Sequence, residues 1–163
     1  MTAKDAQVLW SLLTPAKIQL SAKKFRLEPL SVKNTRGERI LADADLALDP
    51  VSGSLRVEWG SLDLTRLDPW LRGGKLSGQS TGSLSARWQK SGMQIMGNLN
   101  MKGAFSRDPI KLEAISGQAQ CAWNEQGLRA TLALDLGQGG NLEVRITSAE
   151  PVQTGPPQSG KIN

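Results

Sequence analysis

The chain has 163 residues, which is enough for one domain with a real core but short for two. Its net charge is +5, yet no block of about five Lys or Arg residues occurs, so the basic stripe typical of nucleic-acid-binding proteins is missing. The sequence contains no histidine, which excludes Ser–His–Asp triads, Cys–His pairs and His-ligated metal sites. A single cysteine, Cys121, excludes an internal disulfide and a thiolate cluster.

The N-terminal residues are polar, and we treat residues 1–8 as an extension that precedes the domain. The first apolar run, residues 8–13, is far shorter than the ~20 residues of a membrane-spanning helix. We therefore expect neither a signal peptide nor a membrane span in this chain. Residues 6–13 suit a short helix, and residues 17–22 and 25–32 suit two strands.

Alternation of apolar and polar residues with a period of two dominates the rest of the chain. Successive side chains on a strand point to opposite faces, so each alternating run predicts a strand with one apolar and one polar face. Such strands are typical of an antiparallel sheet, and the short turns between them predict that neighbours pair as a meander. The expected strands cover residues 40–48, 55–59, 75–88, 93–105, 115–123, 128–136 and 142–146.

One segment between these runs suits a helix. Residues 61–71 have leucines at helical spacing, with Ser61 or Asp63 as a cap, and Pro69 limits the segment to a short helix or a single turn. We place a β-rich domain over residues 9–148. The Pro- and Gly-containing residues 149–163 have the composition of a tail or linker.

The carboxylates and the cysteine do not form a convincing catalytic site. Asp43 and Asp45 share one strand face, and Asp135 could approach Glu143 across a hairpin, as glycosidase chemistry would require. These acidic residues alternate with apolar ones, however, so they belong on the wetted side of their strands. Cys121 has the apolar parity and suits a small buried core residue. We therefore predict no enzyme, no catalytic residue, no metal ligand and no cofactor.

Glycine recurs on the apolar parity, although it weakens a strand. The positions are Gly78, Gly82, Gly97, Gly103 and Gly117. One explanation is a closed β-sandwich, in which small residues lie where two sheets cross. The other is a single sheet that curls into a trough, whose interior bulky side chains would block. The residues alone leave both explanations open.

Three stretches of the chain share a pattern of leucine, proline and glycine or of strand alternation. The first is residues 66–71, Arg-Leu-Asp-Pro-Trp-Leu, followed by residues 74–78, Gly-Lys-Leu-Ser-Gly. The others are the alternating residues 40–46 and 130–140. The first stretch resembles the motif punctuation of TamB-like proteins of the AsmA-like group, and the other two resemble strand pairs of the same family. The likeness extends over residues 8–148 and consists mostly of strand alternation punctuated by glycine.

The resemblance implies a fold and a function. TamB-like proteins are bridge-type lipid-transfer proteins, anchored in the inner membrane and extended across the periplasm of Gram-negative bacteria. Their all-β fold is a long, curved antiparallel sheet, the β-taco, with an apolar concave face. They are implicated in phospholipid transport to the outer membrane and in outer-membrane protein assembly and secretion with TamA. By this resemblance the chain is a non-catalytic periplasmic segment that lacks the membrane anchor.

We expect the apolar groove of this segment to be lined by uncharged strand residues. They are Leu76, Leu84, Trp88, Met93, Ile95, Leu99, Met101, Phe105, Leu132, Leu134 and Val144. The expected partners are phospholipid acyl chains or the precursor of an outer-membrane β-barrel, with a TamA-like protein as a further partner and no nucleic acid. An exposed apolar groove also predicts dimerisation through that face. The competing hypothesis is a closed β-sandwich that serves as a structural or protein-interaction module without lipid cargo.

Overall fold

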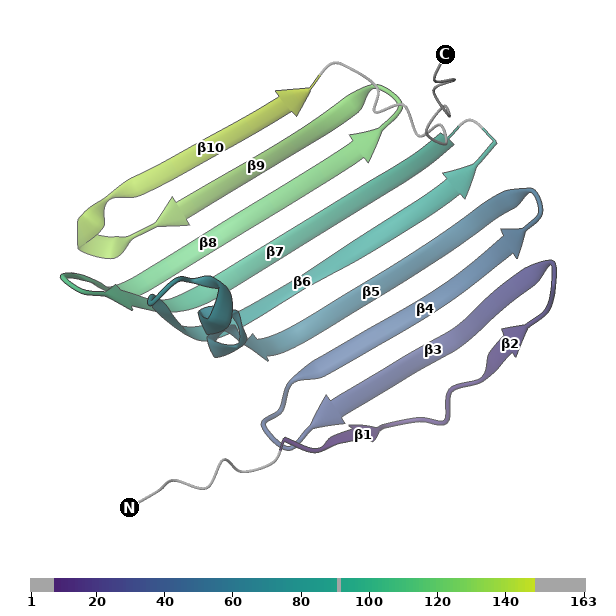
Figure 1. Cartoon of the computed structure of the whole chain (residues 1–163), viewed down its shortest axis with the longest axis horizontal. Coiled ribbons are helices and arrows are strands. Elements are labelled where there is room, and N and C mark those ends of the chain that lie inside the picture. Colours follow the sequence, from purple (N-terminus) through teal and green to yellow (C-terminus); the bar gives the residue numbers. More distant parts are fainter. Residues whose placement is uncertain (1–7, 91, 149–163) are drawn as a thin grey trace, which may run out of the picture.

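The computed structural model describes residues 8–90 and 92–148. These residues form one antiparallel sheet of ten strands and two short 3-10 helices (Figure 1). The strands are β1 (Trp10–Leu12), β2 (Ile18–Leu20), β3 (Lys24–Asn34), β4 (Arg39–Leu48), β5 (Val51–Asp63), β6 (Lys75–Gln89), β7 (Gly92–Arg107), β8 (Ile110–Asn124), β9 (Gly127–Asp135) and β10 (Asn141–Ser148). The helices are η1 (Leu64–Trp70) and η2 (Gly137–Gly139). The prediction of an all-β, antiparallel fold is confirmed. The extension and the tail fall largely or wholly outside the described residues.

The strands follow one another across the sheet as a meander, as predicted. From β3 to β10 each strand pairs with the next one in the chain, so sequence neighbours lie side by side (Figure 1). The N-terminal edge is the exception, because β1 and β2 both pair with β3. The expectation of a helix near the N-terminus is wrong for the residues described, since β1 pairs with β3 and places Leu12 opposite Val32. Pairing with an available strand edge here overrides local helical spacing.

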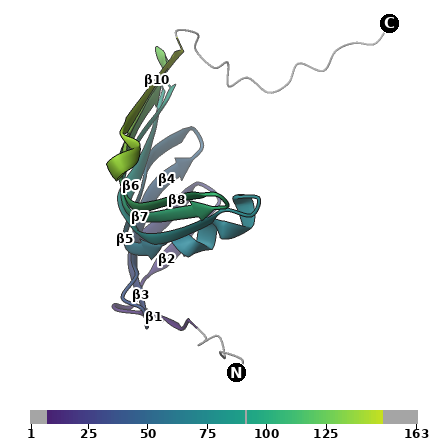
Figure 2. The ribbon, with the colours of Figure 1, turned by 90° about the vertical axis from the view of Figure 1, so that its left-hand side faces the viewer.

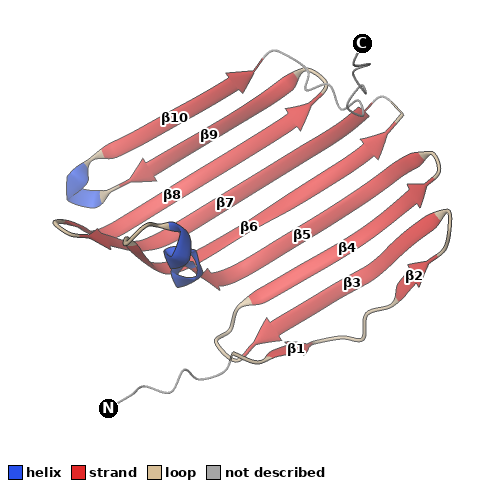
Figure 3. Ribbon diagram, in the orientation of Figure 1, coloured by secondary structure: helices blue, strands red, loops and turns tan. Residues whose placement is uncertain are grey.

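The sheet is a single layer. Seen edge-on it is a thin curved band, and η1 lies against one side of it (Figure 2). Strands make up most of the described chain, and both helices lie at the same end of the strands (Figure 3). The closed β-sandwich is therefore wrong for residues 8–90 and 92–148, since all ten strands belong to one sheet. The conserved direction of twist in β-sheets accounts for the departure from a flat layer.

The strand register collects the apolar side chains on one face, which we call the apolar face. Residues directly opposite each other in an antiparallel ladder point to the same side of the sheet. One row across the sheet runs from Val144 in β10 through Leu132, Ala119, Leu99, Gly82, Trp59 and Ile40 to Val32 in β3. The neighbouring rows are built in the same way, so the face is continuous from β3 to β10.

Three β-bulges keep this face apolar where the alternation changes phase. Each inserts one extra residue into a strand, which returns the following apolar side chain to the same side. The residues that flank the bulges are Leu27 and Leu30 in β3, Trp59 and Leu62 in β5, and Leu112 and Ile115 in β8. In β5 the bulge contains Ser61, whose φ of 56° lies in the left-handed region. Without these bulges the ends of the three strands would present polar residues to the apolar face.

The larger buried hydrophobic side chains lie toward the end of the sheet near η1. Leu64, which begins η1, and Leu76, the second residue of β6, are both buried, as is Ile115 in β8. The other buried hydrophobic residues, Ala44 in β4 and Ala86 in β6, are small and lie further along the strands. The Asp63 side chain caps η1 by accepting a hydrogen bond from the Thr65 amide at 3.0 Å, as one of the two expected caps. The Asp68 carboxylate accepts a hydrogen bond from the Leu76 amide at 2.8 Å and so fastens η1 to β6.

Candidate apolar binding face

All eleven predicted groove residues lie on the apolar face by register, but in different surroundings. Leu84, Leu99, Leu132 and Val144 line a common hollow. Leu76 and Phe105, which are opposite each other in β6 and β7, lie at the end near η1. Trp88, Met93 and Ile95 lie toward the β6–β7 turn, and Met101 and Leu134 each lie opposite Gly117 in the next row. The predicted residues therefore share a face, and four of them share a hollow.

The hollow on the apolar face crosses β5 to β10 and has a volume of about 340 Å³. Small residues form its floor, and larger side chains form its sides. The floor residues are Gly97, Ala119, Cys121 and Ala130. Alternation of small and large side chains along the rows leaves this depression, because a row of large residues would fill it. Its volume lies at the lower end of the ~300–1,000 Å³ usual for small-molecule sites.

Two further residues of the hollow, Trp59 and Ile146, were absent from the predicted set. Both have the apolar parity, but only the strand register shows that they lie beside Leu84 and Val144. The indole of Trp59 occupies the space above Gly82, where a Cβ atom would lie 2.4 Å from Trp59 Cζ2. Glycine at this position therefore makes room for the ring of a neighbouring strand. A glycine paired with a tryptophan of the neighbouring strand is the signal that could have added Trp59 to the predicted groove residues.

The apolar face is open along β9 and β10. Leu142 is 46% exposed and Ile146 is 53% exposed, although both lie on the apolar side of β10. Scattered apolar side chains on a surface need no explanation, whereas a continuous apolar face is a candidate for a binding surface. Cys121 is half-buried within this face, rather than fully buried as its parity suggested.

The face is closed at the end near η1. Leu76 is only 9% exposed, and Phe105 lies against the loop that follows η1, since a Cβ atom at Gly74 would lie 2.7 Å from Phe105 Cε2. Leu76 therefore belongs to the packed core, whereas Phe105 is half-buried. Leu76 does not line an open groove, because η1 and its loop take the place that a ligand would occupy.

A second and larger hollow, of about 730 Å³, lies over the polar side of β6 to β10. Its lining includes Asn100, Lys102, Asp135 and Glu143. The Asp135 carboxylate accepts a hydrogen bond from the Gly137 amide at 2.9 Å, and Glu143 forms an ion pair with Arg145 at 2.7 Å. These acidic groups already have partners and are well exposed. Both faces of the sheet thus have a hollow, but the linings of the two hollows differ in chemistry. The apolar face is the better candidate for a binding site.

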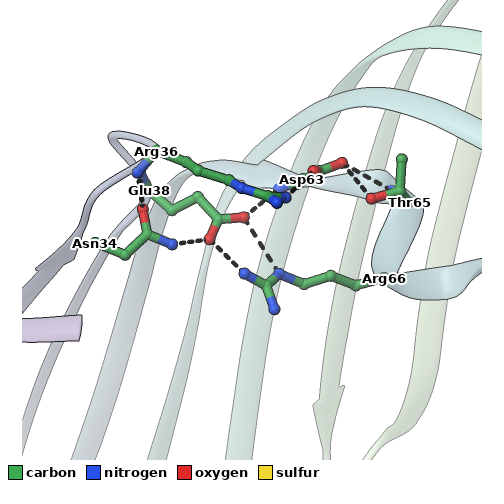
Figure 4. A network of polar contacts seen from close by, with 6 residues as sticks. All are labelled: Asn34, Arg36, Glu38, Asp63, Thr65 and Arg66. Atoms are coloured by element: carbon green, nitrogen blue, oxygen red, sulfur yellow. Dashed lines mark hydrogen bonds and ion pairs between the residues drawn. The ribbon is translucent and has the colours of Figure 1, made fainter. Parts of the chain in front are cut away.

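A buried polar cluster joins three segments beside η1 (Figure 4). Glu38, in the turn between β3 and β4, is only 1% exposed. Its carboxylate accepts hydrogen bonds from the Asp63 amide at 2.7 Å, from Arg66 Nη2 at 2.6 Å and from the Asn34 side chain. Asn34 in turn accepts from the amides of Arg36 and Glu38. The cluster clamps the β3–β4 turn to the end of β5 and to η1.

The electrostatics of the cluster agree with a structural role. The hydrogen bond from Arg66, followed by those from the Asp63 amide and Asn34, outweighs the effect of burial and lowers the pKa of Glu38. The same contact raises the pKa of Arg66. Both groups therefore stay charged at neutral pH, and neither is poised to exchange a proton with a substrate.

Neither a metal centre nor a membrane-spanning helix is present in the part of the chain that the structure describes. No three His, Cys, Asp or Glu side chains among these residues are grouped so that they could hold a metal ion. None of the helices described is long and apolar enough to cross a membrane. Asp45, one of the paired acidic residues in β4, lies 3.0 Å from Lys24 in an exposed ion pair.

Comparison of the chain with protein-family models, with curated proteins and with solved structures finds no significant match. A function can therefore be inferred only from the geometry of the sheet and the chemistry of its two faces.

Proposed function

We propose that this chain is a non-catalytic module that shelters the acyl chains of phospholipids on its apolar face. The observation that supports the proposal is the register, which places uncharged side chains opposite one another from β3 to β10. No second sheet covers this face among residues 8–90 and 92–148. The resemblance to TamB-like proteins supplies the wider setting, which is transport toward the outer membrane through the periplasm.

The energetics of acyl-chain binding suit such a surface. Neighbouring strands lie ~4.8 Å apart, so the strands from β3 to β10 give the face a length of about 35 Å across the sheet. Each methylene group removed from water contributes about 0.8 kcal/mol, so ten sheltered methylenes would contribute at most ~8 kcal/mol. An open face shelters an acyl chain on one side only, so the gain is smaller.

The proposed setting includes specific partners and a location. A periplasmic module of this kind would receive phospholipid from the inner membrane and pass it on toward the outer membrane. A TamA-like outer-membrane protein is the protein partner that the family resemblance suggests. The precursor of an outer-membrane β-barrel is a competing occupant, because its strands also have one apolar face.

Native mass spectrometry of the purified full chain, with lipid extraction of the same sample, tests the proposal. We expect phospholipid to co-purify and to be taken up from vesicles of phosphatidylethanolamine and phosphatidylglycerol. Leu99→Asp and Leu132→Asp each place a carboxylate in the apolar hollow, so each should abolish uptake. Burial of an unpaired charge against an acyl chain is costly, whereas the same charge on the wetted face is not.

Matched controls lie next to each of these residues on the opposite face. Asn100→Asp and Ala133→Asp add the same charge to β7 and β9 but point away from the apolar face, and neither residue lines the apolar hollow. Both should keep full lipid uptake, and circular dichroism should show that all four variants remain folded. A wild-type protein that is free of lipid and refuses added lipid would refute the proposal. Preferential binding of an unfolded outer-membrane protein would favour the competing occupant.

A further inference from the structure

The two edges of the sheet are built differently. At the N-terminal edge, β3 is covered by β1 and β2, which have three residues each and are separated by a segment that contains Pro15. At the other edge, β10 is an uninterrupted strand of eight residues, all of them exposed. A short or proline-interrupted edge discourages pairing with another chain, whereas a long, regular edge invites it. Among residues 8–90 and 92–148, the open edge of the sheet is thus the one formed by β10.

We propose that β10 pairs with β10 of a second copy of this chain. The two strands run antiparallel, with Val144 of one copy opposite Val144 of the other. The pairing joins the two sheets edge to edge and is distinct from contact between their apolar faces. Backbone geometry limits the registers that are possible, and side-chain charge selects this one among them.

The backbone groups that face outward are set by the pairing of β10 with β9. The Leu136 amide donates a hydrogen bond to the Gly140 carbonyl at 2.8 Å, so that carbonyl faces β9. Antiparallel ladders alternate, which turns the backbone groups of Leu142, Val144 and Ile146 toward β9 as well. The amides and carbonyls of the alternate residues, Asn141, Glu143, Arg145 and Thr147, then point outward. These amides and carbonyls can be satisfied only in a register that places outward-facing residues of one copy opposite outward-facing residues of the other.

Charge selects one register among those that the backbone allows. With Val144 on the twofold axis, Leu142 lies opposite Ile146 of the other copy, and Glu143 lies opposite Arg145. Displacement of the axis by one residue in either direction puts Arg145 opposite Arg145 or Glu143 opposite Glu143. Like charges directly opposite each other destabilise a strand pair, whereas opposite charges stabilise it. The sequence of β10 is therefore complementary to itself in this register.

The pairing also extends the apolar face. Leu142, Val144 and Ile146 lie on that face and are among its more exposed members. In the dimer these side chains meet their counterparts across the axis, and the apolar faces of the two copies become one continuous surface. The exposed apolar residues of β10 thereby gain the neighbours that an edge strand lacks.

Exchange of the two charges tests the register. Glu143→Arg alone and Arg145→Glu alone each place like charges opposite one another twice in the dimer. Each should weaken self-association by about tenfold or more, equivalent to ~1.4 kcal/mol, as measured by sedimentation velocity over a range of concentrations. An equimolar mixture of the two single variants restores both opposite-charge pairs between copies. The mixture should therefore dimerise, although neither variant has the Glu143–Arg145 pair within its own strand.

A cysteine on the twofold axis gives a second, independent test. Val144 pairs with itself at a position without hydrogen bonds, where the Cα atoms are ~4.5 Å apart and within reach of a disulfide. In a Cys121→Ala background, Val144→Cys should form a covalent dimer on oxidation. Ile146→Cys is the matched control, because position 146 faces position 142 of the other copy and should not cross-link to itself.

Three results would overturn the proposal. The first is a wild-type chain that stays monomeric at every accessible concentration. The second is self-association that neither single charge reversal weakens. The third is a dimer that Leu99→Asp disrupts while the charge reversals do not, which would indicate contact through the apolar faces instead of the edges.

Discussion

The end of the sheet near η1 and the region formed by β9 and β10 arise from the same alternating sequence but are packed in opposite ways. Near η1, Leu64, Leu76 and Ile115 are buried, and Glu38 clamps the β3–β4 turn to η1. In β10 every residue is exposed, and its apolar side chains face solvent. The comparison indicates that the larger buried side chains and the polar cluster that stabilise the sheet lie near η1, away from the proposed binding surface. Substitutions that destabilise the protein and substitutions that abolish binding to the apolar face should therefore lie in different regions.

The largest expected effect is at the buried cluster. Glu38→Ala leaves the Asp63 amide and the Asn34 side chain without their acceptor, and buried donors without partners are costly. We expect a loss of about 2–4 kcal/mol in the free energy of unfolding, measured by urea denaturation followed by Trp fluorescence. Arg66 stays half-exposed and regains water, so the loss should fall below that of a fully buried pair.

The control for this variant is an ion pair in the open region. Glu143→Ala removes a carboxylate whose partner, Arg145, is largely exposed. Exposed pairs contribute ~0–1 kcal/mol, so this variant should unfold at nearly the wild-type urea concentration. Equal losses for the two variants would show that the buried cluster does not concentrate stability as we infer.

Two glycines of β7 compare the regions within one strand. A Cβ atom at Gly103 would lie 1.9 Å from the Ser77 carbonyl oxygen, which belongs to the backbone and cannot move aside. At Gly97, in the hollow, the nearest atoms are the Cys121 sulfur at 2.9 Å and a Leu84 methyl group at 3.3 Å, which can move. Gly103→Ala should cost about 1–3 kcal/mol and Gly97→Ala less than ~1 kcal/mol, as measured by urea denaturation. Gly97→Ala should instead weaken lipid uptake, because it fills the floor of the hollow.

The smallest effect concerns pH. The pKa of Glu38 is lowered in the folded protein, chiefly by Arg66, and that of Asp63 is lowered chiefly by the Thr65 amide. The unfolded chain therefore binds these protons more readily, and the stabilisation present above the ordinary pKa values is lost as pH falls through the lower folded values. Thermal unfolding between pH 7 and about pH 3 should show a decline below about pH 4.5 that is shallower in Glu38→Gln. An identical decline in both proteins would assign the acid sensitivity to other carboxylates.

Much of the sheet could be predicted from the sequence because period-two alternation is a direct record of burial on one face. The runs around Leu84, Leu99 and Leu132 indicated β6, β7 and β9, and the short turns between them indicated a meander. The three bulges could not be predicted, since an extra residue breaks the alternation and looks like the end of a strand. Residues near the N-terminus, including Trp10, have helical spacing. Nothing in the local sequence reveals that the edge of β3 is available to pair with them.

The sequence predicts which face of the sheet carries the candidate site, but not where on that face the site lies. Leu99 and Val144 were assigned to the groove correctly as to face, whereas Leu76 has the same parity but is buried beside η1. Only the packing of a short helix against the strand ends separates these cases. The burial of Glu38 has no signal in the sequence, because a charged residue in a turn normally indicates exposure to solvent, and two of its partners, Asp63 and Arg66, lie 25 and 28 residues away in sequence.

The meander of single-layer strands has a consequence for how such a molecule can change in size. From β3 to β10 the strands pair only with adjacent strands, so the pairing within one hairpin does not depend on the total number of strands. Architectures with only nearest-neighbour contacts tolerate the gain or loss of whole units. Removal or duplication of one hairpin would change the width of the sheet by ~10 Å while every remaining row kept its register. The width of this fold can therefore evolve in steps of two strands.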